Sequence, residues 1–149
     1  MGFLIDTNIL SEVQKGDRAD PSVRAWYDSI DAHDLYLSVL VIGEVHQSID
    51  RLHRRDPAQA EQLTQRLISV KADFNGRILP VCAAVAERWG RNNVPDALPV
   101  IDGLLAATAQ VHGLTLVTRN VKDVERSGVL LLNPFSDASE SQTALSKCR

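Results

Sequence analysis

Three acidic residues stand at points of the sequence where a reactive site could use them. Asp6 directly follows a short apolar run at residues 3–5, Glu44 lies early in a predicted helix, and Asp102 lies in the first turn of another. Each has an ordinary structural alternative, such as a turn, a solvated helix face or a favourable helix dipole. Three carboxylates within about 5 Å would repel by ~3 kcal/mol per pair. Such a cluster persists only if a proton or a cation relieves the repulsion.

The chemistry of these donors indicates a hard divalent cation. The four histidines and two cysteines show no spacing typical of a zinc site, and we expect His46 not to be a ligand and Cys82 to be a small core residue. An all-oxygen site suits Mg²⁺ or Mn²⁺. These ions activate water and stabilise the leaving oxygen at a phosphodiester. Metal-dependent phosphodiester hydrolysis is therefore the reaction that this set of acids suits.

A fourth polar group follows a predicted strand at residues 115–117. Asn120 can cap a helix that begins at residue 121, with Asp123 completing an acidic version of the capping box. The alternative is that Asp123 belongs to the acidic site, and the sequence leaves both open. Thr118 and Asn120 are expected to support the site as polar neighbours, and Thr7 and Asn8 are expected to form the turn that holds it open.

The elements that must position these groups alternate between strand and helix. Apolar runs predict strands at residues 2–5, 35–37, 78–79, 115–117 and 129–132. Helical periodicity, caps and prolines predict helices at residues 10–14, 21–29, from 39 to about 52, from 57 to about 70, 81–91, 100–112 and 121–126. This alternation predicts an α/β fold with a mostly parallel central sheet flanked by helices. The groups that follow its strands then meet at one edge.

Bulk composition narrows the class of protein. The 149 residues fit one domain, expected at residues 1–135, followed by a polar and mobile tail at 136–149. No apolar stretch approaches the ~20 residues of a membrane span, and no secretion signal is evident, so we expect a cytoplasmic protein. The net charge of −3 argues against a protein that coats nucleic acid by bulk electrostatics. Any contact with nucleic acid must be local or depend on a metal or a partner.

Four blocks together resemble the PIN-domain ribonucleases, and within them the VapC/FitB-type toxins of bacterial type II toxin–antitoxin modules. The blocks are Leu4-Ile5-Asp6-Thr7-Asn8, Gly43-Glu44-Val45, residues 101–109 around Asp102, and Leu116-Val117-Thr118-Arg119-Asn120. The resemblance covers about residues 3–135 and implies a single three-layer PIN-like domain. It matches Asp6, Glu44 and Asp102 to the family's metal-binding acids. It leaves open whether Asn120 or Asp123 supplies the fourth position of the metal site. The segment after Glu44 differs in sequence from that of many relatives.

The resemblance also implies an activity and partners. The chain would be an endoribonuclease that uses Mg²⁺ or Mn²⁺, cleaves RNA and inhibits translation and growth until a VapB-type antitoxin binds. It would form a homodimer and a hetero-oligomer with the antitoxin, using an apolar clamp between residues 39 and 73, and would meet DNA only through the antitoxin. Candidate RNA contacts are Arg51, Arg54, Arg55, Arg77 and Arg119.

Two other readings of the sequence compete with this one. One is a catalytically silent PIN-like binding module in an antitoxin–DNA regulatory complex. The other is a phosphatase of the haloacid-dehalogenase type, which also begins with a strand ending in Asp. That type normally has a second Asp two residues on, where this chain has Asn8. The phosphatase is therefore disfavoured.

Overall fold

A five-stranded parallel sheet forms the centre of the computed structural model, which describes residues 1–135. The strands lie in the order β3-β2-β1-β4-β5, and every neighbouring pair is parallel. Their bounds are β1 Phe3–Ile5, β2 Leu35–Ser38, β3 Ile78–Leu79, β4 Thr115–Val117 and β5 Leu131–Leu132. The predicted α/β class and parallel sheet are confirmed.

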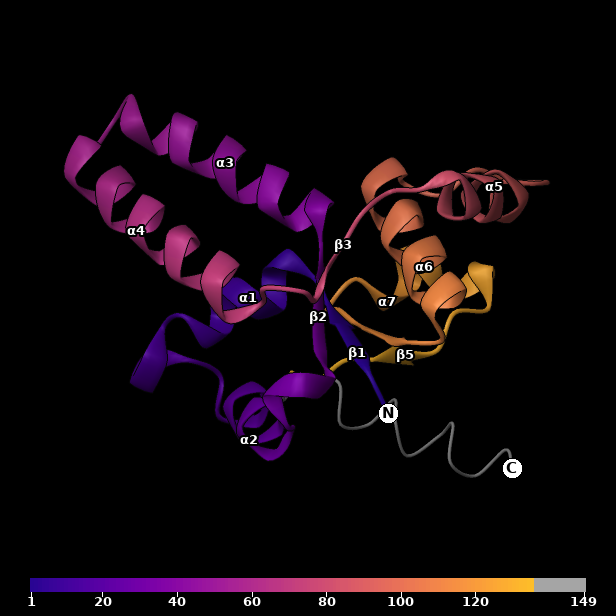
Figure 1. Cartoon of the computed structure of the whole chain (residues 1–149), viewed down its shortest axis with the longest axis horizontal. Coiled ribbons are helices and arrows are strands. Elements are labelled where there is room, and N and C mark those ends of the chain that lie inside the picture. The colour runs from indigo at the N-terminus through magenta and orange to yellow at the C-terminus, as the bar shows by residue number, and fades with distance from the viewer. Residues whose placement is uncertain (136–149) are drawn as a thin grey trace.

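Helices cover both sides of this sheet (Figure 1). Their bounds are α1 Thr7–Val13, α2 Pro21–Ser29, α3 Val39–His53, α4 Pro57–Asp73, α5 Ala83–Asn92, α6 Val100–His112 and α7 Val121–Val124. The helical pair α3–α4 projects on one side, and the packed pair α5–α6 lies on the other. Three of the predicted caps form: Asp20 accepts from Ser22 N at 2.8 Å, Asp56 accepts from Gln59 N at 3.1 Å, and Gly113 ends α6 with φ 65°.

The connections reverse direction between β1 and β4. From β1 the chain steps through β2 to the edge strand β3, and it then returns to β4 on the other side of β1 and continues to β5. Right-handed crossovers therefore place α1–α4 and α5–α7 on opposite faces. Open parallel sheets bind ligands at such a reversal, in the crevice beyond the carboxyl ends of the two strands. Asp6 and Thr118 are the residues that follow these two strands.

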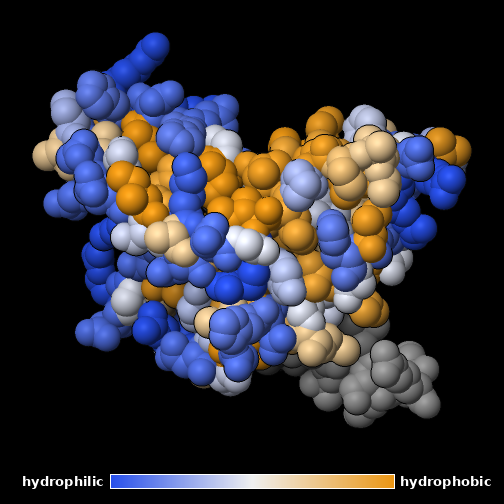
Figure 2. Space-filling model, in the orientation of Figure 1, coloured by the Kyte–Doolittle hydropathy of each residue, from blue (hydrophilic) through white to orange (hydrophobic). Residues whose placement is uncertain are grey.

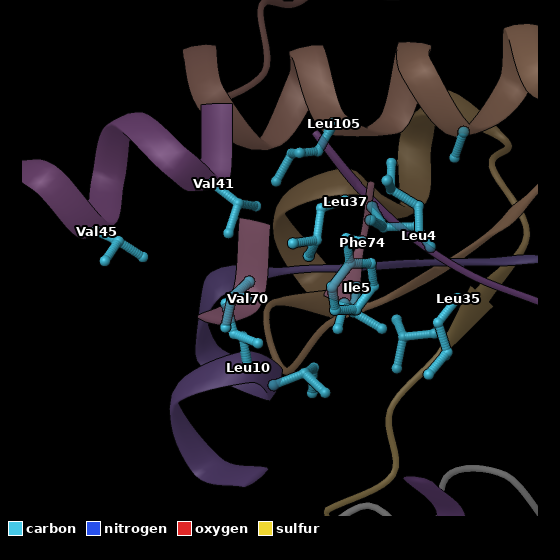
Figure 3. Close-up of a cluster of buried hydrophobic side chains, with 14 of the residues drawn as sticks. Leu4, Ile5, Leu10, Leu35, Leu37, Val41, Val45, Val70, Phe74 and Leu105 are labelled. Carbon is cyan, nitrogen blue, oxygen red and sulfur yellow. The ribbon is translucent and has the colours of Figure 1, made fainter. Parts of the chain in front are cut away.

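The core lies between the sheet and these helices (Figure 3). Leu4, Ile5 and Leu37 from the central strands are fully buried. They are joined in one buried cluster by side chains from α1, α3, α4 and α6, including Leu10, Val41, Val45, Val70, Phe74 and Leu105. Because each strand is covered on both sides, its residues read as short apolar runs rather than as an alternation. Close packing of this cluster fixes where the strand ends lie.

Several predicted boundaries and one predicted burial are wrong. Helix α1 begins at Thr7 rather than residue 10, because Asp6 accepts from Thr7 N at 2.7 Å and starts the helix at once. Helix α5 begins at Ala83, and Cys82 at its N-cap is exposed rather than in the core, because the link after β3 runs over the surface. The last strand is shorter than predicted. The predicted tail at 136–149 lies outside the described residues, and within residues 1–135 no helix is long and apolar enough to cross a membrane.

Candidate metal centre

Asp6 is held at the carboxyl end of β1 by four neighbours. Its backbone N–H donates to Val117 O at 3.0 Å, which extends the β1–β4 pairing by one residue. Its side chain is only 5% exposed. One carboxylate oxygen accepts from Thr7 N at 2.7 Å, and the other accepts from Thr118 Oγ1 at 2.8 Å and Asn8 Nδ2 at 3.4 Å. Burial nevertheless raises the pKa of Asp6, against the lowering effect of Thr118 and Thr7.

Glu44 reaches the same place from helix α3. The Ser38 hydroxyl caps α3 by accepting from Leu40 N at 3.1 Å, so the helix starts where β2 ends. Glu44 is half-buried at the edge of the apolar stripe, as predicted. Its Oε1 accepts from Thr7 Oγ1 at 2.9 Å, so Thr7 links Glu44 to Asp6. Burial raises the pKa of Glu44, the Thr7 hydrogen bond lowers it, and the charge of Asp6 raises it further.

Asp102 comes from the opposite face of the sheet, in the first turn of α6. The pKa of this carboxyl is raised to about 6, first by burial and then by the charges of Asp6, Asp123 and Glu44. Three carboxylates from three other segments of the chain therefore lie within electrostatic reach of Asp102. The helix itself is set close to α5, because Gly103 faces Trp89 and Leu98 so tightly that an added Cβ would lie 3.3 Å from each.

One of the two arrangements predicted for Asn120 and Asp123, the capping box, does not form. Asn120 occupies the N-cap position of α7, but its side chain makes no capping hydrogen bond, so the predicted capping box does not form. Instead Asn120 N donates to Thr118 Oγ1 at 3.1 Å, and Thr118 in turn donates to Asp6. The charge of Asp123 acts on Asp102. Asp123 therefore lies within electrostatic reach of Asp102, and the choice between Asn120 and Asp123 as the fourth ligand stays a prediction.

The oxygen atoms that surround the site are ligands of the kind that a hard divalent cation prefers. The side chains are carboxylates, with threonine hydroxyls and an asparagine amide next to them, and oxygen ligands of this kind suit Mg²⁺ or Mn²⁺. As they stand, however, no three Asp, Glu, His or Cys side chains within residues 1–135 are grouped closely enough to surround an ion. Burial raises the pKa of Asp6, and burial together with three neighbouring negative charges raises that of Asp102, so a bound cation would stabilise the ionised form of both.

Comparison with known proteins identifies the family of this chain. The family model described as "PIN domain" matches residues 3–126. The chain belongs to the PIN-domain family. A curated relative of this PIN domain, Toxin FitB of Neisseria gonorrhoeae, is 30% identical over 91% of this chain and 99% of its own length. Another, VapC ribonuclease Y4jK of Sinorhizobium fredii, is 27% identical over 91% and 99%.

Solved structures extend the similarity to the whole fold. FitAcB from Neisseria gonorrhoeae has a TM-score of 0.81 to this PIN domain, with 31% identity over 89% of this chain and 97% of that chain. A toxin–antitoxin complex from Klebsiella pneumoniae has a TM-score of 0.66, with 26% identity over 90% and 98%. The resemblance found in the sequence is therefore confirmed at the level of family and fold.

The predicted RNA-contact arginines divide into three groups in this PIN domain. Arg77 is committed to the opposite edge of the sheet, where it donates to Leu35 O at 2.9 Å and to Asp73 O at 2.7 Å. Arg119 lies beside the acids, with its backbone N–H on Asn8 Oδ1 at 3.4 Å and its guanidinium 4.4 Å from the Phe135 ring centre. Arg51, Arg54 and Arg55 are exposed at the far end of α3. The structure thus brings Arg119 to the site, keeps Arg77 away from it, and leaves Arg51, Arg54 and Arg55 exposed at and just beyond the end of α3.

Proposed function

We propose that this PIN domain is a Mg²⁺- or Mn²⁺-dependent endoribonuclease and the toxin of a toxin–antitoxin pair. The observation that carries this proposal is that Asp6, Glu44 and Asp123 lie within electrostatic reach of Asp102 near the β1–β4 reversal, with pKa values raised at Asp6, Glu44 and Asp102. Curated relatives bear the names toxin and ribonuclease, including Ribonuclease VapC1 of Rickettsia felis, which is 30% identical over 85% of this chain.

In this proposal the acids bind the ion, and their polar neighbours hold the acids in position. Asp6, Glu44 and Asp102 hold the cation, and Asp123 supplies the fourth position. Thr7 and Thr118 fix the carboxylates of Glu44 and Asp6 by direct hydrogen bonds, while Asn8 and Asn120 brace the two strand ends. The bound ion would polarise the phosphodiester and lower the pKa of an attacking water.

RNA cleavage by the purified chain tests the catalytic part. We expect cleavage with Mg²⁺ or Mn²⁺, none with EDTA, and a loss of at least about 100-fold on Asp6→Asn. The matched control is Asp17→Asn, because Asp17 is an exposed acid in a short turn at Gly16–Arg18. Thermal unfolding by circular dichroism checks that both variants fold. Equal cleavage by Asp6→Asn and wild type, free of contaminating nuclease, would show that these acids are not the catalytic site.

An apolar surface supports the antitoxin part. Figure 2 shows a hollow between the α3–α4 side and the α5–α6 side whose walls are rich in hydrophobic atoms. Exposed apolar side chains in the segments nearby include Val39 at the start of α3, Val81 after β3, and Val100 and Ile101 at the start of α6. Exposed apolar surface of this kind marks a protein interface. We propose that a VapB-type antitoxin covers it, that the chain also forms a homodimer, and that DNA is met only through the antitoxin.

Growth on induction tests this second part. We expect expression of the chain to arrest growth, and co-expression of the neighbouring small open reading frame to relieve the arrest and yield a co-purifying complex. A complex that forms with a chain that neither cleaves RNA nor arrests growth would favour the silent binding module. The cytoplasmic location stays a prediction.

A further inference from the structure

Three exposed arginines lie at the end of helix α3 and just beyond it, on the stretch that leads away from Glu44. Successive helical residues turn by about 100°, so Arg51, seven residues after Glu44, lies about 20° from it around the helix axis. Arg54 follows at the C-cap, and Arg55 comes next in the chain. With a rise of about 1.5 Å per residue, Arg51 is about 10 Å and Arg54 about 15 Å along the axis from Glu44. Arg51 therefore lies beyond Glu44 and nearly in line with it, whereas Arg54, ten residues after Glu44, lies about 80° from it around the axis.

These arginines line one open hollow of about 690 Å³ on the surface of α3. Gln47 and Asp50 complete its lining, so three arginines and one aspartate give it a net charge of +2. Within residues 1–135, the guanidinium groups of Arg51, Arg54 and Arg55 make no hydrogen bond or ion pair with the protein. Figure 2 shows mostly hydrophilic surface over the free end of the α3–α4 pair, in contrast to the apolar base near the sheet.

We infer that Arg51, Arg54 and Arg55 form a phosphate-binding track for single-stranded RNA that flanks the cleaved bond. Arginine offers five donors in a planar fork that suits phosphate. The track is too far from the acids to bind the phosphate that reacts, so it contacts phosphates further along the strand. A chain with a net charge of −3 needs such a local basic strip to hold a polyanion. This inference rests on the proposed ribonuclease function and adds the path of its substrate.

The salt dependence of RNA binding tests the track directly. The variant Arg51→Gln/Arg54→Gln/Arg55→Gln is compared with Arg66→Gln/Lys71→Gln/Arg91→Gln, which removes the same charge from exposed positions on α4 and α5. Binding of a fluorescent single-stranded RNA is followed by anisotropy in EDTA, so that no cleavage intervenes. Each lost phosphate contact should lower the slope of log K against log salt by about 0.7, or about 2 for the track variant. The control variant should change the slope by less than half of that.

A lysine variant that keeps the positive charge, and a comparison of long with short RNA, separate phosphate binding by the arginines from other effects of the substitutions. Arg51→Lys/Arg54→Lys/Arg55→Lys should keep most of the salt slope, because lysine binds phosphate as a point charge. With Mg²⁺, the glutamine variant should raise KM about 10-fold on a long RNA at low salt, with kcat unchanged. It should leave cleavage of a very short RNA, confined to the reacting bond, unaltered.

The outcomes separate this inference from the proposed function. Equal salt slopes for the track and control variants would overturn the track, whether or not the wild type cleaves RNA. A reduced slope with no cleavage by the wild type would support RNA binding on α3 and contradict the ribonuclease. Unchanged RNA binding, together with weaker binding of the co-purified protein partner, would assign the arginines to that partner instead and overturn the inference.

Discussion

Removing the charge of Asp102 should stabilise the metal-free protein. The pKa of this carboxyl is raised from 3.8 to about 6 by burial and by three neighbouring acids. A carboxyl whose folded-state pKa exceeds its unfolded-state pKa makes an unfavourable contribution to stability once it ionises. This contribution is absent below about pH 4, grows between about pH 4 and 6, and is complete above that range. The variant Asp102→Asn keeps the shape of the side chain and lacks the charge.

The magnitude follows from the pKa. The difference between 3.8 and about 6 corresponds to roughly 3 kcal/mol at about 1.4 kcal/mol per pKa unit. Asp102 is only half-buried, and solvent screening reduces this value, so we expect a gain of about 1–2 kcal/mol at about pH 7.5. For a chain of 149 residues this is a rise in Tm of about 3–6 °C.

Urea unfolding in EDTA at two pH values measures this gain. The exposed-acid variant Asp17→Asn serves as the control and should stay within about 0.5 kcal/mol of wild type at both pH values. The gain of Asp102→Asn should be present at about pH 7.5 and vanish at about pH 4. Saturating Mg²⁺ should shrink or reverse it, because the ion stabilises only a chain that binds it. No gain near pH 7.5, or the same gain near pH 4, would refute the electrostatic account of the site.

Three further variants test how the fold positions the acids. Thr118→Val removes the buried 2.8 Å hydrogen bond to Asp6, so the free energy of unfolding measured in urea at neutral pH should fall by about 1.5–3 kcal/mol, whereas Thr118→Ser should restore most of it. Gly103→Ala places a Cβ 3.3 Å from Trp89 Cδ1, and overpacking of about 1–3 kcal/mol should outweigh the helix gain of about 1 kcal/mol, visible as a lower Tm and altered tryptophan fluorescence. Ser38→Ala removes the cap of α3 and should cost about 1 kcal/mol in the same assay, and an unchanged midpoint would contradict the role of the cap.

The sequence predicts the position of the acids well because each is tied to a local signal. Asp6 ends an apolar strand, Glu44 and Asp102 lie near helix starts, and the parallel topology brings these points to one edge. The hydrogen bond from Thr7 to Glu44 joins residues 37 positions apart, so no local pattern could predict it. Trp89 against Gly103 is likewise a contact between two helices, set by packing alone.

Two local patterns predicted something that the structure does not have. Cys82 stands in a short apolar run, which favours burial, yet the link between β3 and α5 crosses the surface and leaves it exposed. Asn120 and Asp123 have the spacing of a capping box, but Thr118 takes the backbone N–H of Asn120, and the side-chain cap does not form. For Cys82 the path of the chain overrides a local preference, and for Asn120 a competing local hydrogen bond, two residues back, does so.

The acids also differ in how firmly the fold holds them, which bears on how an ion would bind. Asp6 is nearly fully buried and fixed by hydrogen bonds from both strand ends, so it cannot move without disturbing β1 and β4. The Glu44 carboxylate accepts one hydrogen bond, the Asp102 carboxylate accepts none within residues 1–135, and both residues are half-buried. A cation that binds Asp6 would therefore find a fixed first ligand and adjustable partners. This difference in mobility explains how the charges of the other acids can act on Asp102 although no three acidic side chains within residues 1–135 are close enough to surround an ion. Because Asp6 is the fixed ligand, its loss should impair ion binding more than the loss of either of the other two acids.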